Sequence, residues 1–174
     1  HVAPDAREAL MDVADAWWEH LMVISPTWAT ALGDRRFDDR LGDLSAEATQ
    51  SHLDTAQRLL EQLERIDKGA LERPQDGVTL EVLRSILIRT IDGRVCQGET
   101  WSVDQLYGLQ VRLPGIVNTH TIRGLADVQS LLSRYAAIGP LMNQHLENLS
   151  TGIEEGRTAF YVAVERVIGQ LEGF

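Results

Sequence analysis

Cysteine is almost absent from this chain, which has one cysteine among 174 residues. The lone Cys96 excludes an intramolecular disulfide and a cysteine-rich zinc site. As a nucleophile, Cys96 would need a neighbouring base, and the sequence places none beside it. We therefore predict that Cys96 is a small, buried hydrophobic residue.

Basic residues are also scarce. Lysine and arginine number 16 against 26 aspartates and glutamates, which gives a formal net charge of −10. Proteins that bind nucleic acids usually present a basic patch or stripe. The densest basic group here, Arg35, Arg36 and Arg40, is interleaved with aspartates. We expect no nucleic-acid partner, and we interpret the aspartate-rich run 38–43 as a salt-bridged, solvated loop.

Long hydrophobic runs are missing as well. A membrane-spanning helix requires roughly 20 apolar residues, and the two longest candidates, 80–91 and 128–142, are interrupted by arginines and by Pro140. No secretory signal is visible at the start. We expect a soluble protein with no membrane partner. Because the chain begins at His1 rather than Met, a leader could already have been removed, so a cytoplasmic and an exported location both stay open.

What the sequence does contain is helical periodicity. Apolar residues recur every three or four positions over most of the chain, as they do along one face of an amphipathic helix. Turn-forming residues separate the periodic stretches. The predicted helices cover approximately 5–24, 26–32, 45–67, 78–95, 125–138, 141–153 and 160–171.

Several residues mark where these helices begin and end. Pro4 or Asp5 suits the opening turn of the first helix, and Ser45 is a typical N-cap. Gly33 is a C-cap candidate. Pro74 is predicted to lie in a turn between two long helices, and Gly139-Pro140 to kink or restart a helix.

One stretch lacks this periodicity. Between residues 98 and 124, aromatic and aliphatic residues lie among Gly108, Pro114 and Gly115 without a sustained repeat. A connection of this length inside a compact domain is usually functional or packed against something else. We therefore predict one all-α domain over 1–174, a bundle of about five to seven helices with a long irregular connection near 98–124.

Catalytic motifs are incomplete. A helical zinc hydrolase needs two histidines four positions apart with a glutamate after the first, and no two of the five histidines have this spacing. No serine stands in a Gly-x-Ser-x-Gly context. We assign ordinary helix-surface or helix-boundary roles to His20, His52 and His145. His120 lies in the irregular stretch, where it either ties down the loop or contributes to a site.

The tryptophans offer a further signal. Trp17 and Trp18 are neighbours on a predicted helix, so they point to different surfaces. An outward one marks an interaction patch or a contact with a missing domain, or it simply packs on a neighbouring helix or loop. A ligand pocket between helices would lie near Trp28, Trp101 and Tyr107.

Short segments spread over nearly the whole chain carry a family resemblance. The segments are Trp17–Glu19, Pro26–Asp34, Asp43–Ser45, Trp101–Gly108, His120–Ile122, Leu132–Tyr135, Gly152-Ile153 and Glu155-Gly156. In this order they resemble the opening portion of a bacterial family known as domain of unknown function eight-eight-five, whose members are predicted to be helical zinc metallopeptidase-like proteins.

The resemblance implies a longer parent protein in which a later helix carries a His-Glu-x-x-His zinc motif. This chain would then be its non-catalytic N-terminal helical domain, contributing a cleft wall or substrate recognition. It would have no cofactor, catalytic residue or metal ligand of its own, and its partner would be the missing C-terminal catalytic portion, which would hold the zinc. A bacterial cytoplasmic or periplasmic location fits equally.

The surface facing that portion is expected at 101–123. The residues expected to face substrate or an interface are Trp101, Gln105, Tyr107, Gln110, His120, Trp17 and Trp28. Two alternatives stay open. The chain could be a self-contained interaction module that associates with itself or another protein, or a helical bundle that binds a small ligand.

Overall fold

The computed structural model describes residues 5–173, and this part of the chain contains helices and no strand. The all-α prediction is confirmed. Six helices of the described residues are twelve residues or longer: α1 (Ala6–Ile24), α3 (Ala46–Glu64), α4 (Pro74–Asp92), α7 (Leu125–Ala136), α8 (Ile138–Glu154) and α9 (Tyr161–Glu172). Shorter helices join them: α2 (Pro26–Ala31), α5 (Leu109–Arg112) and α6 (Ile116–Thr119).

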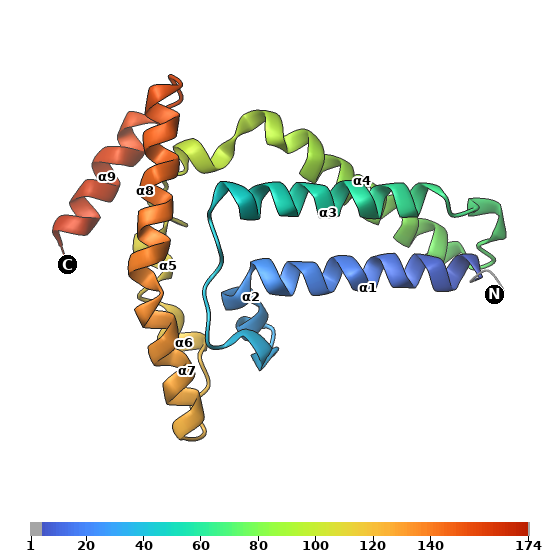
Figure 1. The fold of residues 1–174 in the computed structure, drawn as a ribbon, viewed down its shortest axis with the longest axis horizontal. Helices are drawn as coiled ribbons and strands as arrows, with labels where there is room; N and C mark the ends of the chain where they lie inside the picture. The colour runs from blue at the N-terminus through green and yellow to red at the C-terminus, as the bar shows by residue number, and fades with distance from the viewer. Residues whose placement is uncertain (1–4, 174) are drawn as a thin grey trace. The chain divides into compact units, whose positions relative to one another are not determined.

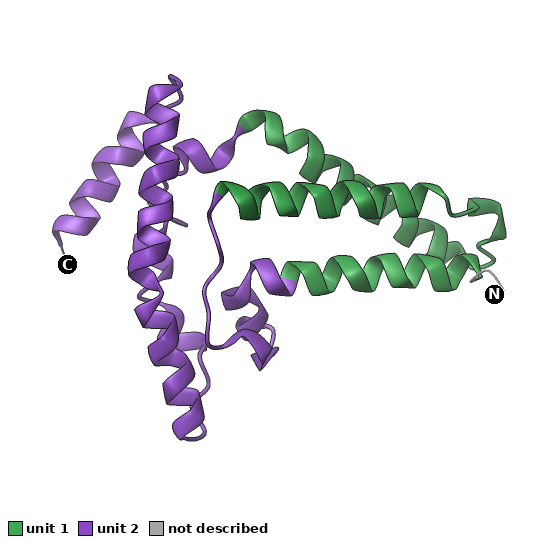
Figure 2. Cartoon of the chain, viewed as in Figure 1, with its two compact units in different colours: residues 1–21, 46–96 green, residues 22–45, 97–174 purple. Residues whose placement is uncertain are grey.

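Contacts divide the chain into two compact units (Figure 2). Unit 1 comprises residues 1–21 and 46–96, and unit 2 comprises residues 22–45 and 97–174. The sequence pattern predicts a single domain over 1–174. Both units are discontinuous in sequence, because the chain passes between them at 21/22, 45/46 and 96/97. Because neither unit is one continuous segment, no change in composition and no linker in the sequence could have indicated the division.

Unit 1 is built from α1, α3 and α4, which lie side by side in Figure 1. Its core joins the apolar stripes of these helices. The buried members are Leu10, Val13, Trp17, Ala56, Leu59, Leu63, Leu80, Leu83 and Leu87. Burying one large aliphatic side chain contributes about 1.5–3 kcal/mol, so this shared core explains why helices that are far apart in sequence pack together.

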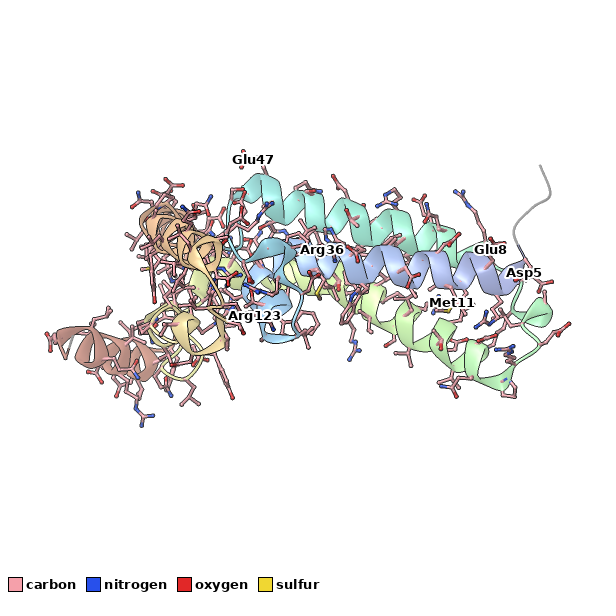
Figure 3. The ribbon with its side chains drawn as sticks, turned by 90° about the horizontal axis from the view of Figure 1, so that it is seen from below. Asp5, Glu8, Met11, Arg36, Glu47 and Arg123 are labelled. Carbon is pink, nitrogen blue, oxygen red and sulfur yellow. The ribbon has the colours of Figure 1, made fainter. Side chains whose placement is uncertain are left out.

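The first helix starts on a side-chain cap. The Asp5 carboxylate accepts hydrogen bonds from the backbone N–H groups of Arg7, at 2.7 Å, and Glu8, at 2.9 Å. Figure 3 shows Asp5 and Glu8 at this end of α1. The cap satisfies donors that a helix N-terminus otherwise leaves without partners. Asp5 is thus the opening residue, and Pro4 lies outside the described residues.

Two predicted boundaries differ from the structure. Pro74 does not lie in a turn but is the first residue of α4, with Gly77 inside the helix. Proline suits this position because its missing N–H would have no intrahelical partner there. The break between α7 and α8 falls at Ala137 rather than at Gly139-Pro140, and Pro140 lies in the first turn of α8 for the same reason.

Unit 2 contains α2 and α5 to α9, and its own core consists of Leu113, Ile116, Leu131 and Leu141. The stretch 98–124 is irregular, as predicted, but it includes two short α-helices and a 3₁₀ turn at Gly98–Trp101. This turn packs closely on α8. A Cβ added to Gly152 would lie 1.9 Å from the Thr100 carbonyl oxygen, so only glycine permits this approach.

The prediction that Cys96 is buried is wrong. Cys96 is exposed at the end of the 3₁₀ turn Gly93–Cys96, beyond the last buried leucine of α4. The helical stripe that would have buried it stops with α4, because a 3₁₀ turn shifts the side-chain direction. No helix of the described residues is both long and apolar enough to cross a membrane.

Candidate binding groove

A groove of about 480 Å³ lies within unit 2. Three segments of the chain form most of its wall, namely 24–28, 41–44 and 109–119, and Leu141 of α8 completes it. The lining is mainly aliphatic, with Trp28, Ser25, Thr27 and Thr119 among the apolar side chains. Ligand pockets commonly measure about 300–1,000 Å³ and combine apolar walls with a few polar groups. The groove therefore has the size and chemistry of a binding site.

An arginine with no exposed surface holds the groove's walls together. The Arg134 side chain of α7 is 0% exposed. Its Nε donates to the Arg40 carbonyl oxygen at 2.9 Å, and one terminal nitrogen lies 2.9 Å from the Phe37 carbonyl and 3.0 Å from the Pro26 carbonyl. A guanidinium presents five N–H donors in a rigid fork, which suits several acceptors at once.

Two of these acceptors lie on or beside a groove segment. Pro26 itself lines the groove, and Arg40 precedes the lining residue Leu41. On the third segment, the Arg134 guanidinium lies 3.4 Å from Nδ1 of His120, whose backbone N–H bonds to Ile116 of the lining. One buried side chain thus bonds to or beside all three segments that form the wall.

The charge of Arg134 is balanced by a buried carboxylate. Asp38 is 4% exposed, and its Oδ1 lies 3.8 Å from the Arg134 guanidinium. The Thr30 hydroxyl links the two groups, because it donates to Asp38 at 2.6 Å and accepts from Arg134 at 2.5 Å. Arg35 donates to the other oxygen of Asp38 at 3.0 Å. The interpretation of 38–43 as a solvated loop is therefore wrong for Asp38, which a buried partner draws inward.

Burial and neighbouring charges shift the pKa of Arg134 in opposite directions. Burial lowers the pKa of its guanidinium, because the charged form loses hydration, and Asp38 and Asp39 raise it. At the edge of the same cluster, the backbone N–H of Arg123 and the Arg35 side chain lower the pKa of Asp127. Asp127 also accepts from the N–H of Gly124, so it caps α7 while it pairs with Arg35.

Helix α8 fixes the wall segment around Leu44. Gln144 accepts from the Leu44 N–H at 3.0 Å, and Asn148 donates to the Leu44 carbonyl at 2.8 Å. Gln144 also donates to Asp43 at 2.9 Å. Both backbone groups of Leu44 are therefore satisfied by side chains one helical turn apart. The wall residue Leu44 is held in place without a neighbouring strand.

The residues expected to form a site do not come together in one place. Trp28, 42% exposed, lines the groove, and Tyr107 lines a smaller hollow of about 240 Å³ beside it. Trp101 is exposed, and Gln105 and Gln110 bond to Gln170 of α9.

The two remaining residues that were expected at a site, His120 and Trp17, make structural contacts. His120 is buried and its Nε2 lies 2.8 Å from the Asp127 carbonyl, so it ties the loop to α7. Trp17 is 5% exposed in the unit 1 core, whereas Trp18 is 47% exposed. The two tryptophans face different surroundings, as expected for adjacent helix positions, and the outward residue is Trp18.

Trp17 lies against a pair of histidines in unit 1. Nε2 of His20 and Nδ1 of His52 are 2.8 Å apart, whereas the ring centroids are 5.1 Å apart with 9° between the planes. Because the nitrogens are much closer than the centroids, the rings meet edge to edge through a hydrogen bond. The Trp17 ring centroid lies 5.6 Å from that of His20 and 5.5 Å from that of His52. Burial lowers the pKa of both histidines, and His52 and Arg58 lower that of His20 further.

No group of three or more histidine, cysteine, aspartate or glutamate side chains that could hold a metal ion occurs between residues 5 and 173.

Arg134 was not predicted as a site residue, although the sequence contained a signal. Arg134 stands three positions after the buried Leu131, on the apolar stripe of α7. A charged residue on a buried stripe needs a buried partner or an acceptor set. The sequence does not reveal that partner, because Asp38 lies far away along the chain.

Together these features define an all-α protein whose second unit holds an apolar groove with wall segments bonded by a buried arginine. The family described as "Bacterial protein of unknown function (DUF885)" matches residues 26–174, and the chain belongs to this family. The resemblance is thus confirmed at the level of the family, and Trp17–Glu19 lies outside the match. No curated protein matches the chain at a significant level.

Proposed function

We propose that this chain supplies the substrate-binding wall of a zinc-dependent, peptidase-like hydrolase and carries no catalytic residue itself. The observation that supports this proposal is the groove of unit 2, whose segments are held by the buried Arg134. A site held by buried hydrogen bonds loses little conformational entropy when ligand binds. This is the property that a recognition surface requires.

The zinc chemistry is assigned to another part of the parent protein. In zinc hydrolases the metal polarises a carbonyl and activates water. The residues between 5 and 173 form no fitting ligand set, so no step of that chemistry is routed through this chain. Its own contribution is to hold an extended substrate segment along residues such as Trp28 and Leu44 of the groove.

The recognition role is tested with the 174-residue chain and short apolar peptides. Binding is followed by NMR chemical-shift changes, and Trp28→Ala is expected to weaken it because the indole is part of the wall. Leu132→Ala is the matched control, since Leu132 is an exposed apolar residue on α7 that does not line the groove. Equal loss in both variants, or no binding by the unchanged chain, would contradict the proposal.

The zinc assignment has a separate test. We expect the natural reading frame to continue past Phe174 and to encode a His-Glu-x-x-His motif. We also expect the product of the whole frame to contain one tightly bound zinc ion, measured by elemental analysis. Stoichiometric zinc in the 174-residue chain alone, or peptide hydrolysis by it, would overturn the division of roles.

A second candidate function is an interaction module. Helix α9 supports it, because it has no buried residue and leaves several large apolar side chains exposed. These are Tyr161, Ile168 and Leu171, together with Phe160 at the helix start. Such a face is typical of a surface that contacts another protein. Sedimentation over a range of concentrations tests self-association, and a strict monomer would rule out dimerisation.

A further inference from the structure

The groove contains one charged side chain among its lining residues, Arg112. Arg112 is the last residue of α5, and its side chain is exposed. Its neighbours Leu109 and Leu113 pack in the unit 2 core, so the backbone that carries it is anchored. No hydrogen bond or ion pair of the Arg112 side chain is found within residues 5–173. A guanidinium on an anchored backbone at an apolar wall is therefore available to a ligand.

We infer that the groove binds a peptide segment in which an apolar side chain lies next to a carboxylate, with Arg112 as the carboxylate partner. This inference rests on the proposed function and names its ligand class. Arginine and carboxylate form paired, charge-assisted hydrogen bonds, which combine affinity with a fixed orientation. The aliphatic wall around Ile116 and Leu141 accepts the apolar side chain.

The position of Arg112 also indicates where the carboxylate lies. Arg112 borders both the groove and the smaller hollow, and the hollow contains Glu99. A negative ligand would be repelled by Glu99 in the hollow, whereas the groove has no acidic lining residue. The charge distribution thus places the ligand's carboxylate on the groove side of Arg112.

A peptide suits the lining better than a plain acyl chain. Ser25 and Thr27 bring hydroxyl groups into the apolar wall, whereas the Thr119 hydroxyl already donates to the Ile116 carbonyl at 3.1 Å. Amide groups of a peptide can exchange hydrogen bonds with the hydroxyls of Ser25 and Thr27, whereas a hydrocarbon chain would offer them no partner, at a cost in free energy. The protein's net charge of −10 repels anions at long range, so the local Arg112 must supply the attraction.

The test measures binding of three probes to the 174-residue chain by calorimetry: acetyl-Ala-Leu-Leu with a free C-terminal carboxylate, the same peptide as its C-terminal amide, and decanoate. We expect the acid to bind roughly tenfold tighter than the amide, as for loss of a hydrogen-bonded ion pair. In Arg112→Gln this difference should disappear. Arg166→Gln is the matched control, because Arg166 is an exposed arginine of unit 2 outside the groove.

The outcomes separate the two proposals. Equal affinity for acid and amide overturns the carboxylate inference and leaves the groove as a binding site. Binding of neither peptide overturns both proposals. Tight binding of decanoate without peptide binding shows that the occupant is an acyl chain, which also contradicts the inference. If Arg112→Gln unfolds at the same temperature as the unchanged chain, misfolding is excluded as the cause of a lost difference between acid and amide affinity.

Discussion

The guanidinium of Arg134 and the hydroxyl of Thr30 are 2.5 Å apart, although 104 residues separate them in the sequence. This hydrogen bond joins α7 to α2 inside unit 2. The same hydroxyl donates to Asp38, so it links the two buried charges. Because polar groups in a buried network depend on one another, the stability of unit 2 and the shape of the groove should respond together to changes at this point.

Replacing Arg134 by methionine is therefore expected to destabilise the protein by about 3 kcal/mol or more, since Asp38 loses a buried partner and three carbonyls lose a donor. Urea denaturation measures this loss. Arg134→Lys should recover part of it, because an ammonium keeps the charge but not the fork. Arg166→Met, at an exposed position, should be nearly neutral. Equal midpoints for Arg134→Met and Arg166→Met would contradict this role.

Gly152→Ala is expected to destabilise unit 2 by roughly 1–3 kcal/mol, because the new Cβ would lie 1.9 Å from the Thr100 carbonyl oxygen and both groups belong to the backbone. Gly139→Ala in the same helix meets nothing within 4 Å and should be neutral or slightly stabilising. Thermal unfolding compares the two. A Gly152→Ala protein as stable as Gly139→Ala would show that the turn at Thr100 moves freely.

Unit 1 should lose stability as the pH falls. Burial lowers the folded-state pKa of His20 and His52, so the unfolded chain binds protons first. Stability is then fully present above the unfolded value of about 6.5 and decreases as the pH falls toward the folded values. Urea midpoints measured from about pH 7.5 to 5 follow this loss.

The double variant His20→Gln/His52→Gln should have a flatter pH profile than the unchanged chain. His145→Gln is the control, because burial also lowers the pKa of His145 but that residue lies in unit 2. The His145→Gln variant should keep the pH dependence that His20 and His52 contribute. An unchanged slope in the double variant would assign the pH dependence to other groups.

Asn148→Leu removes the donor to the Leu44 carbonyl. We expect a loss of about 1 kcal/mol or more, the usual cost of leaving a partly buried acceptor without its partner, and weaker peptide binding because Leu44 lines the groove. Asn143→Leu on the exposed face of α8 is the matched control. Equal peptide affinity in the two variants would show that Leu44 takes no part in peptide recognition.

Much of the secondary structure follows from local patterns. The three-to-four-residue apolar repeat located the long helices. Gly33, with a φ of +92°, follows the C-cap residue Leu32 of α2 and takes the left-handed conformation that a cap glycine provides. Pro74 and Pro140 were misplaced because a proline marks either a break or a first turn, and sequence alone does not distinguish them.

The site was less predictable. Trp28 lines the groove, whereas Trp17 is buried in the unit 1 core. Arg134 was overlooked because its acceptors are backbone carbonyls of Pro26, Phe37 and Arg40, which have no signature in the sequence. Side-chain identity predicts a donor, whereas only the fold specifies which carbonyls surround it.

The sequence by itself determined the all-α class, the net negative charge and the family, since these depend on periodicity, composition and the order of short segments along the chain. Only the tertiary structure decided that Asp38 is buried beside Arg134, and that residues 24–28, 41–44 and 109–119 form one groove. The physical reason is the range of the interactions. Helix formation is specified within a few residues, whereas the burial of a charge depends on partners that only the folded chain brings within hydrogen-bond distance.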